Sequence, residues 1–221
     1  MDEPTLFRAY DVRGIYPSQI NYQVAYRIAY ALFSSLPGER FVIGYDMRNG
    51  TEDLIKAFAQ GAKALNKQLV SIGMSTTDRV YFALGKYNFA GGIILTASHN
   101  PREWLGIKMF GPQVTPLNLE QIHQKYRELS SLDVPPMPSD TTGLELLDVK
   151  ADYVKHVLSF VNVENVSNVS VVVDAGNGLG GVNAQDVFRA IPRVELHSLF
   201  CEPNANFPHH EANPAIANST K

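Results

Sequence analysis

The sequence predicts an α/β protein: a three-layer α/β/α domain with a mixed, mostly parallel sheet, followed by a partial second domain of similar type. The first reason is that short apolar runs of strand length alternate with longer segments whose apolar residues recur at helical spacing. The second reason is that the strand–turn–helix pattern starts again after a proline-rich stretch at residues 134–138. We therefore expect a first domain over residues 1–148 and an incomplete second domain over residues 149–221.

In the first domain, the opening helix carries Val24, Ile28 and Leu32 at helical spacing, and Pro37-Gly38 ends it. Thr51 precedes two acidic residues, an arrangement that favours the start of another helix. Helices are predicted over residues 22–36, 51–65, 77–87 and 119–129, and strands over residues 41–45, 69–73 and 90–96. Strands that alternate with helices indicate parallel pairing through crossover connections.

The second domain repeats this pattern over a shorter length. Its predicted elements are a helix over residues 149–161, a strand over 169–174, a glycine-rich turn over 176–181, a helix over 182–191 and a strand over 194–200. Two strands are too few for a parallel sheet that is covered on both faces. Val171, Val172 and Val173 place apolar side chains on both faces of the first strand. Two arrangements would cover this strand: packing on the first domain, or pairing with the same segment of a second copy across a two-fold axis. We expect the second, a homodimer, because pairing also satisfies the backbone groups of the strand edge.

Composition excludes several classes of partner. Hydrophobic residues make up 45% and charged residues 19% of the chain, which is typical of a globular protein. A net charge of -3 and a pI near 6.1 provide no electrostatic footprint for nucleic acid. No apolar run approaches the roughly 18 residues that span a membrane. The single cysteine, Cys201, fits a reducing compartment, so we expect a cytoplasmic protein.

Polar loops follow three of the predicted strands: Asp46-Met47-Arg48, Thr96–Pro101 and Asp174–Gly178. In open α/β sheets, ligands bind beyond the carboxyl ends of the strands, so these loops are candidate binding segments. Each loop, taken alone, equally fits an ordinary capped turn, because Asp, Asn, Ser and Gly are common turn residues. Ser98 beside His99 does not make a hydrolase triad, because the side chains of neighbouring residues diverge.

Taken together, the motifs are similar to those of the α-D-phosphohexomutases, the phosphomannomutase and phosphoglucomutase family. That family opens with Tyr-Asp-(Ile/Val)-Arg-Gly, here Tyr10–Gly14. It carries a phosphorylated serine in Thr-Ala-Ser-His-Asn-Pro, here Ser98, and keeps a lysine ten residues further on, here Lys108. The other matching segments are Gly44–Arg48, Asp174–Gly178 and Phe207–Pro214. The matches occur in order along nearly the whole chain.

The resemblance implies intramolecular phosphoryl transfer between the 1- and 6-positions of a hexose phosphate, with glucose or mannose 1,6-bisphosphate as activator. Ser98 would carry the phosphoryl group, and its phosphate would be one ligand of Mg²⁺. Arg13 would hold phosphate with its fork of donors, and Lys108 would assist proton removal from the attacking hydroxyl. His99 would orient the group or shuttle a proton. The remaining residues that the resemblance places at the substrate are Tyr10, Asp46, Arg48 and Asn100.

The chain also departs from the family pattern. Trp104-Leu105-Gly106 stands where many relatives have Tyr-Asn-Gly, so one polar contact near the phosphate is in doubt. The Asp-Gly-Asp-x-Asp-Arg loop, whose aspartates bind Mg²⁺ in the family, does not occur before Lys221. Neither do the segments that read the sugar hydroxyls and the distal phosphate. We therefore expect an incomplete second domain and a half-chain without turnover.

Three alternatives stay open at this point. A half-chain with an intact phosphosugar-facing loop could be a non-catalytic binding or regulatory protein. Gly176–Gly181 matches Gly-x-Gly-x-x-Gly and is followed by Glu202, as in dinucleotide-binding proteins, although Asp174 sits where a pyrophosphate would approach. A zinc site formed by Cys201, His209 and His210 would have only three ligands at an unusual spacing.

Overall fold

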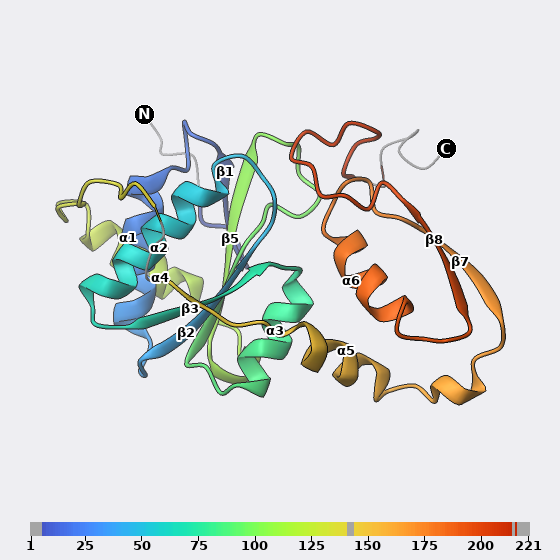
Figure 1. The fold of residues 1–221 in the computed structure, drawn as a ribbon. Helices are drawn as coiled ribbons and strands as arrows, with labels where there is room; N and C mark the ends of the chain where they lie inside the picture. Colours follow the sequence, from blue (N-terminus) through green and yellow to red (C-terminus); the bar gives the residue numbers. More distant parts are fainter. Residues whose placement is uncertain (1–5, 141–143, 214, 216–221) are drawn as a thin grey trace.

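The computed structural model describes residues 6–140, 144–213 and 215, which form a larger and a smaller unit (Figure 1). The elements of the larger unit are β1 (Val12–Ile15), α1 (Tyr22–Ser35), β2 (Arg40–Tyr45), α2 (Thr51–Ala64), β3 (Gln68–Met74), α3 (Thr77–Lys86), β4 (Gly91–Leu95), β5 (Trp104–Phe110), η1 (Pro112–Val114), α4 (Leu119–Glu128) and β6 (Glu145–Leu146). The elements of the smaller unit are α5 (Lys150–Leu158), η2 (Val163–Asn165), β7 (Val169–Asp174), α6 (Gly180–Phe188) and β8 (Val194–Leu199). Pro214, the last residue of the expected Phe207–Pro214 segment, lies outside the described residues.

The larger unit is built on a six-stranded sheet with the strand order β1-β5-β4-β2-β3-β6. Strand β2 is parallel to β3 and β4, and β3 is parallel to β6. Strand β5 runs antiparallel to both β4 and β1. The predicted mixed, mostly parallel sheet is therefore confirmed, and its three predicted strands correspond to β2, β3 and β4.

The sequence patterns do not predict β1, β5 or β6. In β5, buried Ile107 and Met109 flank the partly exposed Lys108, which is the alternation of a strand with one buried face. The polar residues at 98–103, immediately before β5, obscure this signal. Because β5 returns antiparallel beside β4, Lys108 lies opposite Ile94 in the register. This pairing brings the lysine back towards the end of the sheet from which the Ser98 loop leaves.

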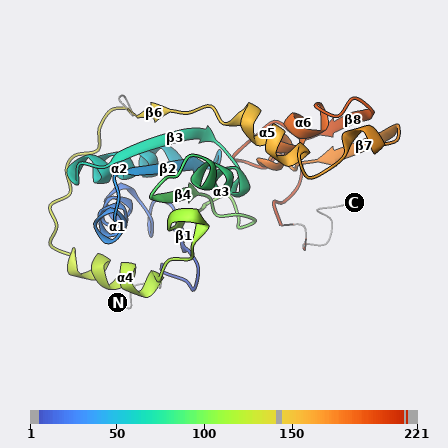
Figure 2. The same ribbon diagram turned by 90° about the horizontal axis from the view of Figure 1, so that it is seen from below.

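Helices cover both faces of this sheet (Figure 2). Helices α1, α2 and α4 pack on one face, where Phe33 lies 4.9 Å from Phe41 and 6.1 Å from Phe58 between ring centroids. Helix α3 packs on the other face, where buried Val80 and Leu84 meet the strands. Fully buried aromatic rings of this kind contribute a large share of the hydrophobic stabilisation of a domain.

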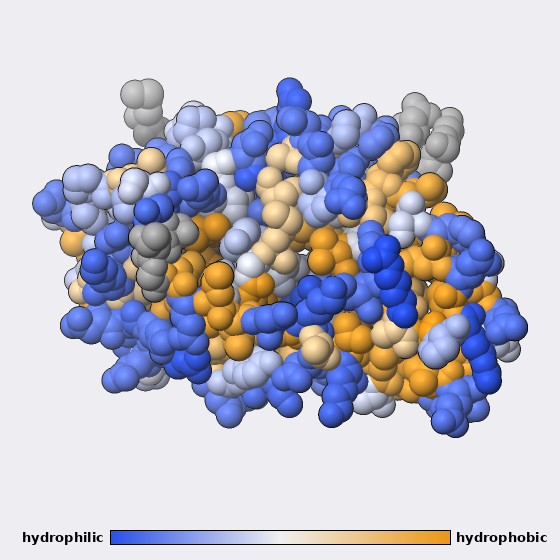
Figure 3. Space-filling view, viewed as in Figure 1, coloured by the Kyte–Doolittle hydropathy of each residue, from blue (hydrophilic) through white to orange (hydrophobic). Residues whose placement is uncertain are grey.

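The smaller unit contains a parallel pair of strands, β7 and β8, with α6 packed against it. Helix α6 starts at Gly180, two residues before the predicted start. A Cβ at the next residue, Gly181, would lie 2.7 Å from the Cα of Cys201, so the first turn of α6 requires glycine. On the right-hand side of Figure 3, apolar residues are exposed over β7 and β8; Val172 is 63% and Leu199 45% exposed.

Polar side chains join α3 of the larger unit to α5 and α6. Asp186 forms ion pairs with Arg79 and Lys150, the latter at 2.5 Å. The amide of Asn183 donates to the carboxylate of Asp78 at 2.9 Å, and the hydroxyl of Tyr153 donates to the same carboxylate. The Arg79–Asp186 pair is mostly buried, with side chains 7% and 11% exposed, whereas Lys150 is 60% exposed. The contacts join the smaller unit to the larger one, and the buried pair is the one whose loss would leave a charge uncompensated. Among the helices of the described residues, none is long and apolar enough to cross a membrane.

Candidate active site

The loop that carries Ser98 begins where β4 ends, pressed against β5. The amide of Thr96 donates to the carbonyl of Gly106 at 2.9 Å. A Cβ at Gly106 would lie 2.4 Å from the carbonyl oxygen of Thr96, so only glycine permits this approach. The third residue of the family's Tyr-Asn-Gly segment is therefore needed here for packing, while the side chain of Leu105 is buried in the core.

Ser98 itself has a left-handed backbone with φ of 58°. A residue with a Cβ adopts this conformation at a cost of about 1–2 kcal/mol, and such strain is concentrated at functional positions. The amide of Ser98 donates to Oγ1 of Thr96 at 3.0 Å, which helps to hold the turn. Ser98 and His99 are both exposed. The turn therefore presents the serine to solvent at the end of a central strand.

Arg48 binds the backbone carbonyls of this loop. Its Nη2 donates to the carbonyls of Ser98 at 2.9 Å and Asn100 at 2.7 Å. Its Nη1 donates to the carbonyls of Pro101 at 2.6 Å and Trp104 at 3.2 Å. Arg48 is 3% exposed, and these bonds occupy both terminal nitrogens of its guanidinium. The geometry therefore favours a loop-positioning role for Arg48 over the substrate contact expected from the sequence.

Asp46 lies behind Arg48 at the end of β2. Its carboxylate accepts from the Arg48 backbone amide at 3.0 Å and lies 3.3 Å from Nε of the same residue. Burial raises the pKa of Asp46, and hydrogen bonds from Thr96 and Arg48 offset only part of this shift. Burial also lowers the pKa of Arg48, with the Asp46 carboxylate acting in the opposite direction. Asp46 thus holds the Arg48 side chain in place, and Arg48 in turn binds the loop carbonyls.

Arg13 and Lys108, the two expected cations, both bind the carboxylate of Asp11, which was not among the predicted site residues. Asp11 is 5% exposed, and its Oδ2 accepts from Arg13 Nη2 at 2.8 Å and from Lys108 Nζ at 2.9 Å. The antiparallel register of β1 and β5, with Val12 opposite Ile107, brings these residues together. Burial by itself would raise the pKa of Asp11, but the hydrogen bonds from Arg13 and Lys108 outweigh it and lower the pKa. The sequence signal that could have identified Asp11 as a site residue is its place in the matched motif Tyr10–Gly14.

Two hollows lie beside the Ser98 loop. The larger, of about 960 Å³, lies between the two units and is lined by Ser98, Asp46 and Arg48 among others. The smaller, of about 450 Å³, is lined by four of the expected site residues: Tyr10, Arg13, Asn100 and Lys108. Tyr10 is 86% exposed, so it is available for contact with a ligand. The structure therefore divides seven of the eight predicted residues between two pockets that share this loop, and His99 lines neither of the two.

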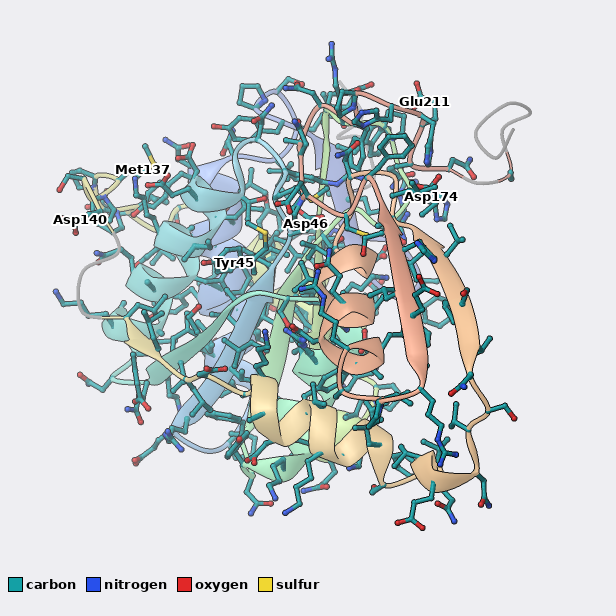
Figure 4. The ribbon with its side chains drawn as sticks, turned by 45° about the vertical axis from the view of Figure 1, so that its right-hand side comes forward. Tyr45, Asp46, Met137, Asp140, Asp174 and Glu211 are labelled. Atoms are coloured by element: carbon teal, nitrogen blue, oxygen red, sulfur yellow. The ribbon has the colours of Figure 1, made fainter. Side chains whose placement is uncertain are left out.

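The smaller unit forms the opposite wall of the larger cavity. Figure 4 shows Asp46 beyond the end of β2 and Asp174 at the end of β7, and both line the cavity. Nε2 of His210 lies 3.0 Å from Oδ1 of Asp174. Burial by itself would raise the pKa of Asp174, but the hydrogen bonds from His210 and the Gly176 amide, together with the charges of His210 and His209, lower it overall. The hydrogen bond with Asp174 raises the pKa of His210.

This wall bears on the dinucleotide alternative. A Cβ at Gly176 would lie 2.4 Å from the ring of His210, so the histidine packs directly on the glycine-rich turn. A pyrophosphate needs this backbone surface free for close approach. The geometry therefore disfavours a dinucleotide at Gly176–Gly181.

The described residues do not form a complete metal site. Nowhere in residues 6–140, 144–213 and 215 do three His, Cys, Asp or Glu side chains gather closely enough to hold a metal ion. Within this part of the chain, Cys201 instead contacts the carbonyls of Val173 and Leu199, and His209 bonds Asn177 at 2.7 Å. A phosphate on Ser98 would supply one oxygen ligand for Mg²⁺ at the edge of the cavity of about 960 Å³.

The larger unit has a three-layer α/β/α fold, and the loop after its central strand β4 presents a strained serine and borders the pocket of Arg13 and Lys108. Residues 4–133 match the family domain described as "Phosphoglucomutase/phosphomannomutase, alpha/beta/alpha domain I". Residues 151–221 match "Phosphoglucomutase/phosphomannomutase, alpha/beta/alpha domain II". The chain belongs to the phosphoglucomutase/phosphomannomutase family.

The chain is similar in sequence to phosphohexose mutases and phosphomannomutases, and similar in fold to a solved structure of the family. The chain is 32% identical to phosphohexose mutases of Xanthomonas campestris over 210 residues, covering 95% of this chain and 47% of that protein. It is 32% identical to a phosphomannomutase of Escherichia coli K12 over 222 residues, covering 98% and 49%. A crystal structure of a family protein from Burkholderia thailandensis superposes with a TM-score of 0.79 at 30% identity, covering 96% and 47%. The chain spans about half the length of the curated relatives it matches.

Proposed function

We propose that this chain carries the phosphoserine half of a phosphohexomutase, in which Ser98 exchanges a phosphoryl group with a hexose phosphate. The observation that carries the proposal is the Ser98 turn: a strained, exposed serine whose loop is held by Arg48 and which opens into the cavity of about 960 Å³. The cations Arg13 and Lys108 line the neighbouring pocket, where they suit the charge of a phosphate. We also propose a cytoplasmic location.

In the proposed reaction, phospho-Ser98 gives its phosphoryl group to the free hydroxyl of a hexose 1- or 6-phosphate. The bond from phosphorus to Ser98 Oγ breaks and a bond from phosphorus to the sugar oxygen forms, while the sugar hydroxyl loses its proton and Ser98 Oγ takes up a proton. In the return step, the bond between the other phosphorus and its sugar oxygen breaks and a bond to Ser98 Oγ forms, while the serine hydroxyl loses its proton and the sugar oxygen takes one up. Catalysis of this kind depends mainly on positioning and on electrostatic stabilisation of the phosphoryl oxygens.

The residues of this chain have separable roles in the proposal. Arg48 fixes the Ser98 turn, and Arg13 and Lys108 stabilise phosphoryl charge, with Lys108 also assisting proton removal. Tyr10 and Asn100 line the smaller pocket, where they would contact the sugar phosphate. His99, exposed beside Ser98, would orient the group or shuttle a proton. Mg²⁺ would bind the serine phosphate.

The loading step tests the proposal directly. The chain is incubated with glucose 1,6-bisphosphate and Mg²⁺, and phosphate is located by peptide mass spectrometry. We expect one phosphoryl group on Ser98 and none in Ser98→Ala. Ser75→Ala is the matched control, because Ser75 lines the same cavity, and it should be labelled like the wild type. Phosphate on another residue, or undiminished label in Ser98→Ala, refutes the assignment.

A binding role without turnover is the second candidate, favoured by the incomplete set of metal donors among the described residues. Each missing preorganised contact to a transferring phosphoryl group costs roughly 3 kcal/mol, so several together cost many orders of magnitude in rate. We therefore propose that the 221-residue chain by itself binds phosphosugar but does not turn it over. A coupled assay with glucose 1-phosphate and mannose 1-phosphate checks this, and conversion at about one per second, the low end of ordinary enzymes, would refute it.

A further inference from the structure

The smaller unit reaches across the cavity to contact the residue that holds the Ser98 loop. The guanidinium carbon of Arg48 lies 5.3 Å from the ring centroid of Phe207, a distance typical of a cation–π contact. Arg48 in turn donates to the carbonyl of Ser98. In Figure 1 the chain segment after β8 lies close to the loop between β4 and β5. Phe207 is therefore one contact removed from the backbone of the serine turn.

The backbone of Phe207 is strained. Its φ is 47°, in the left-handed region that a bulky residue rarely adopts. Glycine would adopt this conformation without strain, so backbone requirements alone do not explain a phenylalanine here. Strain of this kind persists where the surrounding structure holds the residue, and it is concentrated at functional sites.

The neighbours of Phe207 supply that support. The Phe207 amide donates to the carbonyl of Asn204 at 3.1 Å, and the Asn204 amide donates to the carbonyl of Asn177 at 2.9 Å. His209 bonds the side chain of Asn177 at 2.7 Å and stacks on Phe200 with 3.8 Å between ring centroids. The segment is thus tied to the glycine-rich turn on both sides of Phe207. This anchoring aims the ring at Arg48.

We propose that Phe207 is a positioning residue for the Ser98 loop: its ring covers the Arg48 guanidinium and so keeps Arg48 on the loop carbonyls. Through this contact the smaller unit controls the order of the serine turn. The role in phosphoryl transfer rests on the function proposed above, whereas the effect on loop order does not.

Two variants separate the ring from the backbone. Phe207→Leu keeps apolar bulk but removes the aromatic face, and Phe207→Gly removes the ring while relieving the strained φ. Phe207→Tyr retains the aromatic face and is the conservative variant. Phe188→Leu is the matched control, because it makes the same change in the same unit at a residue that does not line the cavity.

Amide hydrogen exchange of residues 96–104 in the unphosphorylated chain is the primary measurement. We expect Phe207→Leu and Phe207→Gly to accelerate it by about tenfold, in line with the loss of a partly desolvated cation–π contact. Phe207→Tyr and Phe188→Leu should remain at the wild-type rate. The labelling of Ser98 from glucose 1,6-bisphosphate should slow by a similar factor in the first two variants only.

The outcomes are distinguishable. Unchanged exchange at residues 96–104 in both Phe207→Leu and Phe207→Gly overturns the inference. The inference is also overturned if Phe207→Gly accelerates exchange only in the glycine-rich turn at residues 176–181, since that would be a purely local structural role. If Ser98 is labelled in no variant but the exchange pattern is as expected, the proposed function fails and the positioning role of Phe207 stands.

Discussion

Arg48 and Asp11 show how residues of the matched motifs act on other residues of the protein. Both terminal guanidinium nitrogens of Arg48 donate hydrogen bonds to carbonyls of the Ser98 loop. Asp11 gathers Arg13 and Lys108 on one carboxylate oxygen. The sequence predicted that the two cations belong to one site, but it could not predict Asp11 as their shared partner. That partnership depends on the β1–β5 register, which no local pattern encodes.

Asp11→Asn tests this arrangement through its pH dependence. The pKa of Asp11 is lowered from its usual 3.8, so its contribution to stability is present above that value and is lost as pH falls through the lowered pKa. At pH 7 we expect the variant to lose about 2 kcal/mol in free energy of unfolding, as for hydrogen bonds to a buried charge. Urea unfolding should show the gap to the wild type shrinking below the usual pKa. Equal free energies of unfolding for Asp11→Asn and the wild type at pH 7, or a difference between them that does not change with pH, would contradict this arrangement.

At the scale of elements, apolar runs bounded by turns were sufficient to predict β2, β3 and β4. Strand β5 was missed because its signal lies in the alternation around Lys108, directly after a polar loop, and its partner is set by tertiary pairing. The positions of α5 and α6 against α3 were equally inaccessible. They depend on polar contacts between residues more than 60 positions apart, such as Asn183 with Asp78 and Tyr153 with Asp78.

Asp186→Ala tests the junction between the units. Asp186 is the shared ion-pair partner of Arg79 and Lys150, and the side chain of Arg79 is 7% exposed. Removing one member of a buried pair leaves the other charge uncompensated, so we expect a loss of about 3 kcal/mol in the free energy of unfolding. Chemical denaturation measures this loss. Glu195→Ala is the control, because Glu195 is an exposed residue of β8 and should change stability little. A similar loss in both variants would argue against a special role for the junction.

The free edge of β7 leads to a prediction about assembly. In the described part of the chain, β7 pairs only with β8, and Val172 is 63% exposed. An open apolar strand edge is a template for pairing with another chain. We expect a dimer of twice 24.4 kDa in analytical ultracentrifugation, formed by β7 of two copies across a two-fold axis and weakened by Val172→Lys. A monomer at high concentration with a sharp unfolding transition would rule this dimer out.

Over the whole molecule, the serine turn sits where the two units meet. Ser98 lies in the loop that follows β4 and lines the larger cavity. Phe207, His210 and Asp174 of the smaller unit line the opposite wall of that cavity. Four of the five matched motifs, those with Asp46, Ser98, Asp174 and Phe207, supply lining residues of this cavity, and the fifth, Tyr10–Gly14, lines the smaller pocket. They could not predict that the smaller unit supports the loop through Arg48, since that contact exists only after the units have packed together.

The central claim is that Ser98 is the phosphoryl-carrying residue, and the most direct measurement is mass spectrometry of the intact protein purified from its native host. Fragmentation of the intact chain should place one phosphoryl group within residues 96–101, and its signal should disappear in Ser98→Ala. Incubation with glucose 1,6-bisphosphate should raise the modified fraction at the same residue. A phosphoryl group located elsewhere, or an undiminished signal in Ser98→Ala, would contradict the account.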